Sequence, residues 1–472
     1  MVKTRIAPSP TGDPHIGTAY TALFNFAYAK KNKGRFILRI EDTDRARLVP
    51  GAEQKIIESL NWLGLTWDER PYRQSERLLL YQKAAKELVE KGVAYYCNCS
   101  PDRLVKVRVE QQARGEAPAY DRKCRFEPPK VARLPSPSGE ASGGQGPFVV
   151  RLKVPESGET AFEDLIRGKI TFQNKDIDDA VLLKSDGWPT YHLAAVVDDT
   201  DMGITHVIRA EEWLSSTPKQ ILLYAAFGHK PPTFAHLPLL RNPDKSKISK
   251  RKNPVAITWY RAQGYLPETL VNYLALMGWS MPNGKEIFSL EEFIENFDLK
   301  RVDPTGPVFD LQKLDWLNGE YIRSLPAKEL TKRLSDYTDV KAAEIEKVLP
   351  LVTERLKKLS GFDELAGFIF NREAPDVAPE LLVPKDKTKG EVAASLTKLA
   401  DEFEKAKLWN KPTIERILET VRETLGWEKS GFYMMVRIAI SGSKVTPPLI
   451  ECLALMNRDK VIAALKVAAE KL

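Results

Sequence analysis

The stretch VKTRIAPSPTGDPHIGTAY, residues 2–20, decides the fold that the sequence predicts. Residues 2–6 have the character of a short strand, a turn rich in proline and glycine follows, and an amphipathic helix is predicted over 15–31. A second strand over 36–40 and a second helix over 52–63 come next. Strands and helices that alternate at this spacing predict a parallel sheet with crossover helices, which is the α/β class.

Size and composition fit a globular protein of several domains. The chain has 472 residues, 43% of them hydrophobic and 29% charged, which suits about three folding units. Its net charge of +7 permits a polyanionic partner without requiring one. No apolar run approaches the roughly 20 residues of a membrane span, and the N-terminus lacks an apolar signal core. We therefore expect a cytoplasmic protein with no membrane partner.

The pattern changes twice along the chain. From about residue 95 to 188 it is broken by a cysteine cluster, a loop-like stretch and short strands, which indicates an insertion into the first fold. Beyond about residue 326 apolar residues recur at helical spacing, which predicts a separate all-α domain. Pro350 must start a new helix or kink one there, whereas Pro412 sits where a helix can begin.

Two segments carry residues suited to phosphate chemistry. The turn over 7–18 leaves a strand and opens a helix, so it should present unpaired N–H groups and a positive dipole end to an anion. His15 can donate to a phosphate oxygen, and Gly17 leaves room for a flat base. The segment KSKISKRK, residues 245–252, suits a loop that closes on a polyphosphate. Taken alone, the first is more often only a turn, and the second only a solvated basic loop or an RNA contact.

Together and in this order, the two segments resemble the HIGH and KMSKS signatures of class I aminoacyl-tRNA synthetases. They stand here as HIGT at 15–18 and KISKR at 247–251. The chain looks most like the bacterial glutamyl subfamily, whose blocks are similar to RIAPSPTG at 5–12, RIEDTD at 39–44, VDD at 197–199 and VIRAEE at 207–212. The similarity covers nearly the whole chain.

The resemblance implies four segments. They are the first half of a Rossmann-type catalytic domain (1–94), an inserted acceptor-stem-binding domain (95–188), the second catalytic half with the KISKR loop (189–325) and a helical anticodon-binding domain (326–472). It also implies that glutamate is activated with ATP and Mg²⁺ to glutamyl-adenylate and transferred to tRNA(Glu). We expect a monomer.

The resemblance assigns roles to particular residues. His15, Lys247 and Lys250 would stabilise charge developing on the phosphates. The glutamate site would comprise Arg5 and Arg209 on the carboxylates, Ser9 and Glu41 on the amino group, and Tyr191 closing the pocket. The ATP site would comprise Pro8, Ser9, His15, Gly17, Lys247, Ile248, Ser249 and Lys250.

A cysteine cluster suggests metal. Cys97 and Cys99 lie in one turn, and Tyr120 and Cys124 follow downstream, which can approach tetrahedral zinc in a structural site. Buried free thiols are the alternative, and similar Cys/Tyr arrangements occur in the insertion of some glutamyl enzymes. The fourth ligand stays open.

Anticodon choice is the least determined feature. Arg355 aligns near the residue thought to exclude glutamine-type tRNA in discriminating relatives, and the alternative is a solvated surface arginine. A non-discriminating enzyme that also charges tRNA(Gln) therefore stays open. Arg209 and the helical tail argue against a glutaminyl-tRNA synthetase. A small-molecule nucleotidyltransferase shares the first loop but requires neither the insertion nor the tail.

Overall fold

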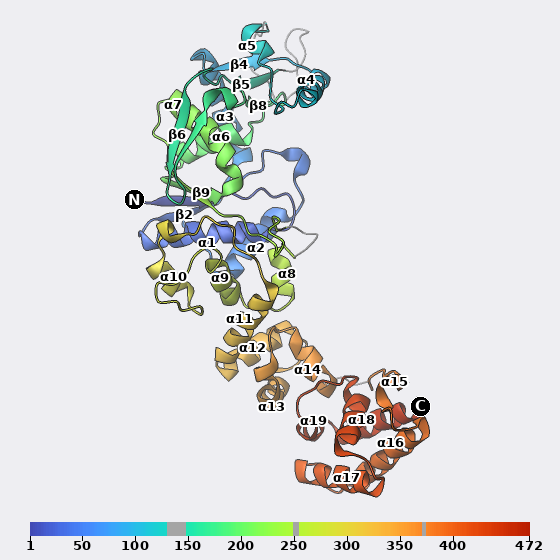
Figure 1. Cartoon of the computed structure of the whole chain (residues 1–472). Coiled ribbons are helices and arrows are strands. Elements are labelled where there is room, and N and C mark those ends of the chain that lie inside the picture. Colours follow the sequence, from blue (N-terminus) through green and yellow to red (C-terminus); the bar gives the residue numbers. More distant parts are fainter. Residues whose placement is uncertain (130–147, 249–253, 371–373) are drawn as a thin grey trace. The chain divides into compact units, whose positions relative to one another are not determined.

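The computed structural model describes residues 1–129, 148–248, 254–370 and 374–472. Within them the chain forms two compact units, which are residues 1–260 with 270–310 and residues 261–269 with 311–472 (Figure 1). All strands of the described residues belong to the first unit, and the second is helical. None of the helices in these ranges combines the length and apolar character that crossing a membrane requires.

The N-terminal part of the first unit confirms the predicted α/β pattern. The expected elements are β1 (Lys3–Ile6), α1 (Ile16–Lys31), β2 (Arg35–Ile40) and α2 (Ala52–Trp62). β1 and β2 pair in parallel, and β3 (Tyr72–Arg73) continues the sheet beyond β2. The connection from α1 into β2 is tight, because a side chain at Gly34 would meet the carbonyl oxygen of Val2 at 2.2 Å.

A second sheet carries the strands that approach the functional site. Its order is β7 (Gly168–Gln173), β6 (Glu159–Asp164), β10 (Thr233–Leu237) and β9 (His206–Ala210). β10 is parallel to both β6 and β9, so the β6–β7 hairpin extends the sheet of β9 and β10 although it precedes them by many residues. Side chains from three distant segments therefore meet across neighbouring strands.

The third sheet is antiparallel and lies beside the cysteine residues. It consists of β4 (Ala94–Cys97), β5 (Val149–Leu152) and β8 (Val181–Leu183). Besides α1 and α2, the described residues of the first unit form α3 (Leu78–Glu90), α4 (Pro101–Ala113), α5 (Lys123–Phe126), α6 (Tyr191–Asp201), α7 (Thr217–Phe227), α8 (Ile257–Ala262), α9 (Pro267–Ala275) and α10 (Leu290–Asn296), of which α8 and α9 run across the boundary between the units.

The second unit packs its helices around one apolar core. They are α11 (Leu311–Ser324), α12 (Ala327–Tyr337), α13 (Ala342–Val352), α14 (Gly361–Phe370), α15 (Pro379–Leu382), α16 (Lys389–Glu404), α17 (Lys411–Thr424), α18 (Lys429–Ser441), α19 (Leu449–Leu455) and α20 (Arg458–Glu470). The predicted stripes are buried, with Ile345 and Ile414 both fully so.

The two prolines of this unit behave differently. Pro412 lies in the first turn of α17, as expected, and Asn410 caps that helix by accepting from the N–H of Thr413 at 3.1 Å. Pro350 does not start a new helix, because α13 continues through it to Val352. The helix ends two residues later, and the short 3₁₀ turn Thr353–Arg355 follows.

Candidate active site

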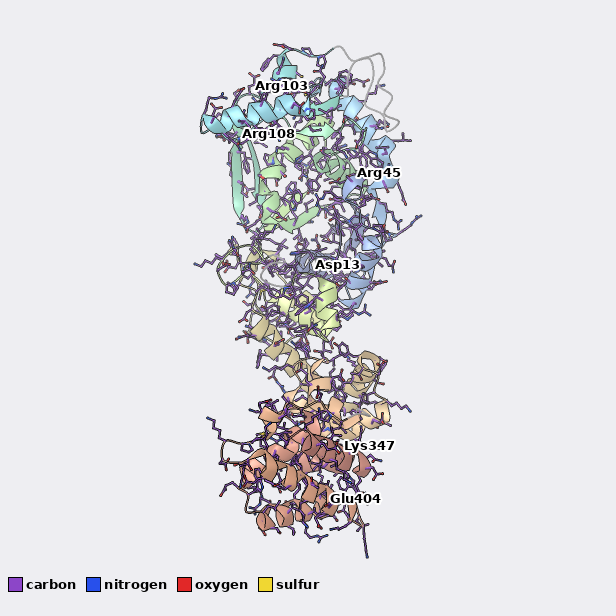
Figure 2. The ribbon with its side chains drawn as sticks, turned by 90° about the vertical axis from the view of Figure 1, so that its right-hand side faces the viewer. Asp13, Arg45, Arg103, Arg108, Lys347 and Glu404 are labelled. Carbon is purple, nitrogen blue, oxygen red and sulfur yellow. The ribbon has the colours of Figure 1, made fainter. Side chains whose placement is uncertain are left out.

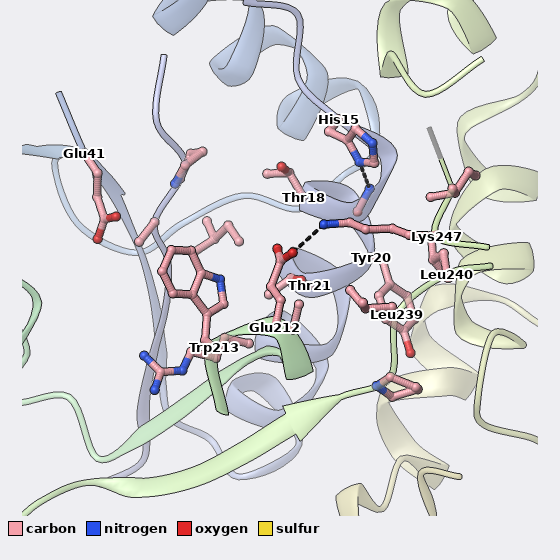
Figure 3. A pocket seen from close by; sticks show the side chains of 18 of the residues that line it. His15, Thr18, Tyr20, Thr21, Glu41, Glu212, Trp213, Leu239, Leu240 and Lys247 are labelled. Carbon is pink, nitrogen blue, oxygen red and sulfur yellow. Dashed lines mark hydrogen bonds and ion pairs between the residues drawn. The ribbon is translucent and has the colours of Figure 1, made fainter. Parts of the chain in front are cut away.

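A cavity of about 370 Å³ opens in the first unit and gathers most of the predicted site residues (Figure 3). The residues that line it include Arg5, Pro8, His15, Gly17, Glu41, Tyr191, Arg209, Lys247 and Ile248. Figure 3 shows Glu41 on one side of Trp213 and Lys247 on the other. Below, the side near Arg209 and Glu41 is called the arginine end, and the side near His15 and Lys247 the lysine end.

Arg209 is the dominant cation of the arginine end. It lies on β9, is 5% exposed, and donates from Nε to Nε2 of His236 at 3.1 Å. Nη1 donates to the hydroxyl of Tyr191 at 2.7 Å, and Nη2 donates to Oγ1 of Thr217 at 2.8 Å. No carboxylate oxygen of the described residues lies within 4.0 Å of this guanidinium. A buried positive charge without an acid partner is costly, so the site favours an anionic ligand.

Arg5 differs because its charge is already balanced. Its Nε and Nη2 donate to the two carboxylate oxygens of Asp199 at 3.2 and 3.4 Å. Arg39, which is fully buried, donates to the same Asp199 at 2.6 Å and to Glu41 at 3.0 Å. Arg39 thus joins the acid behind Arg5 to the acid that lines the cavity.

The two acids of this network respond differently to their surroundings. Burial raises the pKa of Glu41, although Arg39 and Arg5 oppose it. Burial also pushes the pKa of Asp199 upward, but its contacts with Arg5 and Arg39 outweigh this and hold it below the ordinary value. Asp199 is therefore the fixed counter-charge of the two arginines, whereas Glu41 is the acid that the cavity presents to a ligand.

At the lysine end, His15 caps the first turn of α1. Its Nδ1 accepts from the N–H of Gly17 at 2.9 Å, so a neutral ring carries its proton on Nε2. A Cβ atom at position 17 would lie 3.0 Å from Nδ1 of His15, and this close approach explains why glycine occupies the position. The expectation of unpaired N–H groups here is wrong, because the N–H of Ile16 donates to Val255 at 2.6 Å and that of Thr18 to His15 at 2.8 Å.

Among the described residues, Lys247 supplies the positive charge of the lysine end. Its side chain is 54% exposed and forms an ion pair with Glu212 across the cavity (Figure 3). Ser249 and Lys250, also predicted here, lie outside the described residues. Ser9 does not line the cavity, is exposed, and accepts through its carbonyl from the N–H of Thr11 at 2.9 Å.

Sequence reasoning missed several residues of the site. Trp213 lines the cavity and packs against Tyr191 with the rings tilted by 39° and their centroids 4.3 Å apart, and Glu212 forms an ion pair with Lys247. Glu212 ends the block VIRAEE and Trp213 directly follows it, so their position close to Arg209 in the sequence could have marked both as site residues. Thr217 and His236, which hold Arg209 from behind, stand in no motif that the sequence singled out.

The predicted zinc ligands do meet. The Sγ atoms of Cys97, Cys99 and Cys124 lie within 4.8 Å of one another, and those of Cys99 and Cys124 are 3.5 Å apart. The hydroxyl of Tyr120 lies 3.4 Å from Cys97 and 3.5 Å from Cys99. Ligands of a tetrahedral Zn²⁺ with Zn–S bonds of about 2.3 Å lie about 3.8 Å apart, so the four groups fit such an ion. None of the four lines the cavity.

Arg355 lies in the second unit, in the 3₁₀ turn after α13. It is exposed, and its Nη1 donates to the carbonyl of Thr446 at 2.7 Å. The side chain is therefore held at the surface, which is more order than a freely solvated arginine would have.

Comparisons with known proteins agree with this picture. Residues 1–316 match the family "tRNA synthetases class I (E and Q), catalytic domain", and residues 329–469 match "Anticodon binding domain". The chain is 47% identical to a glutamate–tRNA ligase of Thermus thermophilus over 99% of this chain and 100% of that protein. It is also 47% identical to one of Acidothermus cellulolyticus over 99% of this chain and 95% of the relative.

A solved structure matches the fold as well. The crystal structure of a glutamate tRNA ligase from Elizabethkingia meningosepticum in complex with its amino acid has a TM-score of 0.79 at 34% identity, and the match covers 100% of this chain and 99% of that one. The expected class I fold with a helical C-terminal region is thereby confirmed. On these grounds the chain belongs to the class I tRNA synthetases of the E and Q type, among the glutamate–tRNA ligases.

Proposed function

We propose that this protein ligates L-glutamate to the 3′ end of tRNA(Glu) at the expense of ATP. One observation carries the choice of glutamate, namely the buried guanidinium of Arg209, which lines the cavity with no carboxylate of the described residues within 4.0 Å. Both amino acids carry an α-carboxylate, but the side chain of glutamine ends in a neutral amide, whereas that of glutamate ends in a second carboxylate that such a cation favours.

The reaction has two steps. In the first, an oxygen of the α-carboxylate of glutamate attacks the α-phosphorus of ATP, the bond from that phosphorus to the oxygen bridging to the β-phosphate breaks, and glutamyl-adenylate and pyrophosphate form. In the second, the terminal ribose hydroxyl of the tRNA attacks the acyl carbon, AMP leaves with the electron pair, and the hydroxyl proton is lost. No covalent nucleophile of the protein is needed, because the substrate supplies it.

The protein contributes orientation and charge. Arg209 and Arg5 hold the carboxylates, Glu41 takes the ammonium group, and Tyr191 covers the amino acid from the side of Trp213. We assign Ser9 to the ammonium group on the resemblance alone, because its side chain does not line the cavity. Arg5 acts together with Asp199, so it adds hydrogen bonds more than net charge. These contacts orient the attacking oxygen of glutamate toward the α-phosphorus of ATP before the bond between them forms.

The lysine end receives the nucleotide. Pro8, Gly17 and Ile248 line the space for ATP, and His15 with Lys247 stabilises negative charge that develops on the phosphates. We assign Lys250 and Ser249 to the same task. Mg²⁺ would arrive bound to the ATP phosphates and lower their charge. Glu212 must release Lys247 when the nucleotide enters.

The test is aminoacylation with radiolabelled glutamate or glutamine on purified tRNA(Glu) and tRNA(Gln) in separate reactions. Glutamate on tRNA(Glu) alone is the expected result. Glutamate on both would mean that the enzyme does not discriminate, whereas loading of glutamine, or no loading, would overturn the proposal.

Arg355 is the residue that we propose to decide between these tRNAs. Its bond to Thr446 fixes the guanidinium at the surface of the anticodon-binding region, where it can meet the edge of an unstacked base. Arg355→Gln should raise charging of tRNA(Gln) relative to tRNA(Glu), and Arg416→Gln, an exposed arginine on α17, serves as the control. An unchanged ratio in Arg355→Gln would remove this role.

We further propose that Cys97, Cys99, Cys124 and Tyr120 bind structural zinc in the inserted segment 95–188. Burial raises the pKa of the Cys99 thiol to about 11, with Cys124 and Cys97 adding to the shift, so Cys99 needs a nearby cation to ionise at neutral pH. The phenolic oxygen of Tyr120 accepts from the N–H of Cys124 at 2.9 Å, as a ligand oxygen would.

Two arginines complete the shell around these ligands. Arg151 lies over the ring of Tyr120 at 3.9 Å, and Nη1 of Arg103, on α4 (Figure 2), lies 3.4 Å from Sγ of Cys99. Arg151 offsets part of the net charge of −2 that three thiolates and a phenolate leave on Zn²⁺, whereas the charge of Arg103 is shared with its ion-pair partner Asp121.

Elemental analysis tests the zinc proposal. One zinc per chain is expected, and Cys99→Ser should reduce zinc content and lower the thermal midpoint. Cys452→Ser, which changes a buried thiol of α19 in the other unit, should leave the zinc content unchanged. Wild-type protein purified without chelator and free of zinc would contradict the site.

The remaining expectations concern the whole molecule. We propose that the four segments 1–94, 95–188, 189–325 and 326–472 act as the two catalytic halves, the acceptor-stem insertion and the anticodon-binding domain. A monomeric, cytoplasmic enzyme stays our prediction, and light scattering on the purified protein tests its oligomeric state.

A further inference from the structure

Three strands bring an acid, a histidine and an arginine into a line behind the cavity. Asp164 ends β6, His236 lies on β10 and Arg209 lies on β9, directly opposite His236 in the register. Nδ1 of His236 lies 2.6 Å from a carboxylate oxygen of Asp164, and Nε2 lies 3.1 Å from Nε of Arg209. Asp164 is 4% exposed and His236 fully buried, and neither lines the cavity.

The protonation of His236 follows from its polar neighbours, which are Asp164 at Nδ1 and, at Nε2, Arg209 and the hydroxyl of Thr217, whose Oγ1 lies 3.2 Å away and can act as donor or acceptor. The Nε of Arg209 is always a donor, so Nε2 of His236 must be an unprotonated acceptor. The ring then carries its proton on Nδ1 and donates it to Asp164. Burial also lowers the pKa of His236, which agrees with a neutral ring.

We propose that Asp164 and His236 are positioning residues for glutamate recognition, which fix one tautomer and thereby the plane of the Arg209 guanidinium. The inference rests on the proposed function, because it takes Arg209 as the group that receives a carboxylate of glutamate.

The hydrogen bonds of Arg209 show what this positioning achieves. The guanidinium has five N–H groups, and three are used by His236, Tyr191 and Thr217. One N–H on each terminal nitrogen remains, which is the number that the two oxygens of a carboxylate accept in a bidentate pair. The acceptor at Nε of Arg209 is the neutral ring of His236, so it fixes the guanidinium without neutralising its charge.

The environment of Asp164 makes this arrangement testable by an isosteric change. Its Oδ1 accepts from three backbone N–H groups, those of Ile166 and Arg167 at 3.0 Å each and that of His236 at 3.3 Å. In Asp164→Asn these donors keep the amide oxygen in place, so the new NH₂ group faces Nδ1 of His236. The ring must then move its proton to Nε2, where it opposes the N–H of Arg209.

Steady-state aminoacylation measures the consequence. Asp164→Asn should raise KM for glutamate about tenfold or more, since an opposed buried donor pair costs on the order of the penalty for an unsatisfied group. KM for ATP and kcat at saturating glutamate should change less than about threefold. Glu163→Gln makes the same chemical change at the preceding, exposed position of β6 and should leave all three constants unchanged.

A second substitution separates positioning from a merely structural role. His236→Gln retains an acceptor for Nε of Arg209 that does not depend on Asp164. In that background Asp164→Asn should add less than a twofold change in KM for glutamate. Equal effects in both backgrounds would show that Asp164 acts independently of the histidine tautomer and would overturn the proposal.

A spectroscopic measurement keeps the proposal open to refutation even if a variant folds poorly. In wild-type protein labelled with ¹⁵N-histidine, long-range ¹H–¹⁵N spectra should show His236 as the neutral ring with the proton on Nδ1, assigned by its loss in His236→Gln. A charged ring or a proton on Nε2 would overturn the relay, whereas failure of wild-type protein to charge tRNA with glutamate would instead refute the proposed function.

Discussion

At the arginine end of the cavity Arg209 is 5% exposed and held by three side chains, whereas at the lysine end the side chain of Lys247 is 54% exposed and, among the residues that the structure describes, is held by Glu212 alone. Arg209 is preorganised by strands that fix the plane of its guanidinium, whereas Lys247 can exchange the carboxylate of Glu212 for a phosphate. The difference suits two tasks, because selecting an amino acid requires fixed geometry, while phosphates that change shape during reaction require a cation that follows them.

Removing the fixed cation should have the largest effect. Arg209→Gln deletes two charge-assisted hydrogen bonds to the glutamate carboxylate, each worth about 1.5–3 kcal/mol, so kcat/KM for glutamate should fall by about 10² to 10⁴. KM for ATP should stay the same in aminoacylation assays. A variant that loses less than tenfold would mean that Arg5 alone can hold the carboxylate.

The network behind Arg5 should show its effect in stability. Asp199→Asn leaves the buried Arg39 without its shortest acid contact, and breaking a buried pair costs about 3–5 kcal/mol, near the lower value here because Glu41 remains. Urea unfolding at pH 7 measures this loss. Asp201→Asn, whose side chain is 58% exposed, should cost less than about 1 kcal/mol and is the matched control.

This stabilisation has a defined pH dependence. The pKa of Asp199 in the folded protein lies below its ordinary value, which is about 3.9 in an unfolded chain. The contribution is therefore fully present above pH 4 and is lost as the pH falls through the folded pKa. In Asp199→Asn the acid limb of the stability curve should be shallower than in the wild type.

Local patterns found the elements of this site but not its cross-strand contacts. β1, α1 and β2 were predictable because each follows from the spacing of apolar residues within a few turns. Asp164 and His236 are 72 residues apart, and their contact depends on the β6–β7 hairpin adding to the sheet beside β10. Periodicity cannot specify such long-range pairing, so the residues that hold Arg209 stayed hidden.

The lysine end shows a different limit of sequence reasoning. The turn before α1 was recognised, but its N–H groups were expected to be unpaired. Val255 occupies one of them, and that contact requires knowing that a segment more than two hundred residues later returns to the start of α1. The same return brings Lys247 and Ile248 to the cavity.

The exchangeable cation should affect chemistry more than amino acid binding. Lys247→Ala should lower kcat by about 10² to 10³, the usual loss when one group that stabilises developing charge is removed, and should leave KM for glutamate within about threefold. Lys230→Ala is the control, since Lys230 is an exposed lysine of the first unit that does not line the cavity. A large rise in KM for glutamate in Lys247→Ala would contradict the division between the two ends.

The smallest effect is expected for the partner of that lysine. Glu212→Gln breaks an ion pair whose side chains are 43% and 54% exposed, and such pairs contribute about 0.2–1 kcal/mol. Lys247 would be released more easily, so KM for ATP should fall by less than about fivefold, and the change should shrink further at high salt because exposed charges are screened. A fall of more than tenfold, insensitive to salt, would mean that Glu212 holds Lys247 as firmly as His236 holds Arg209, and the contrast between the ends would then disappear.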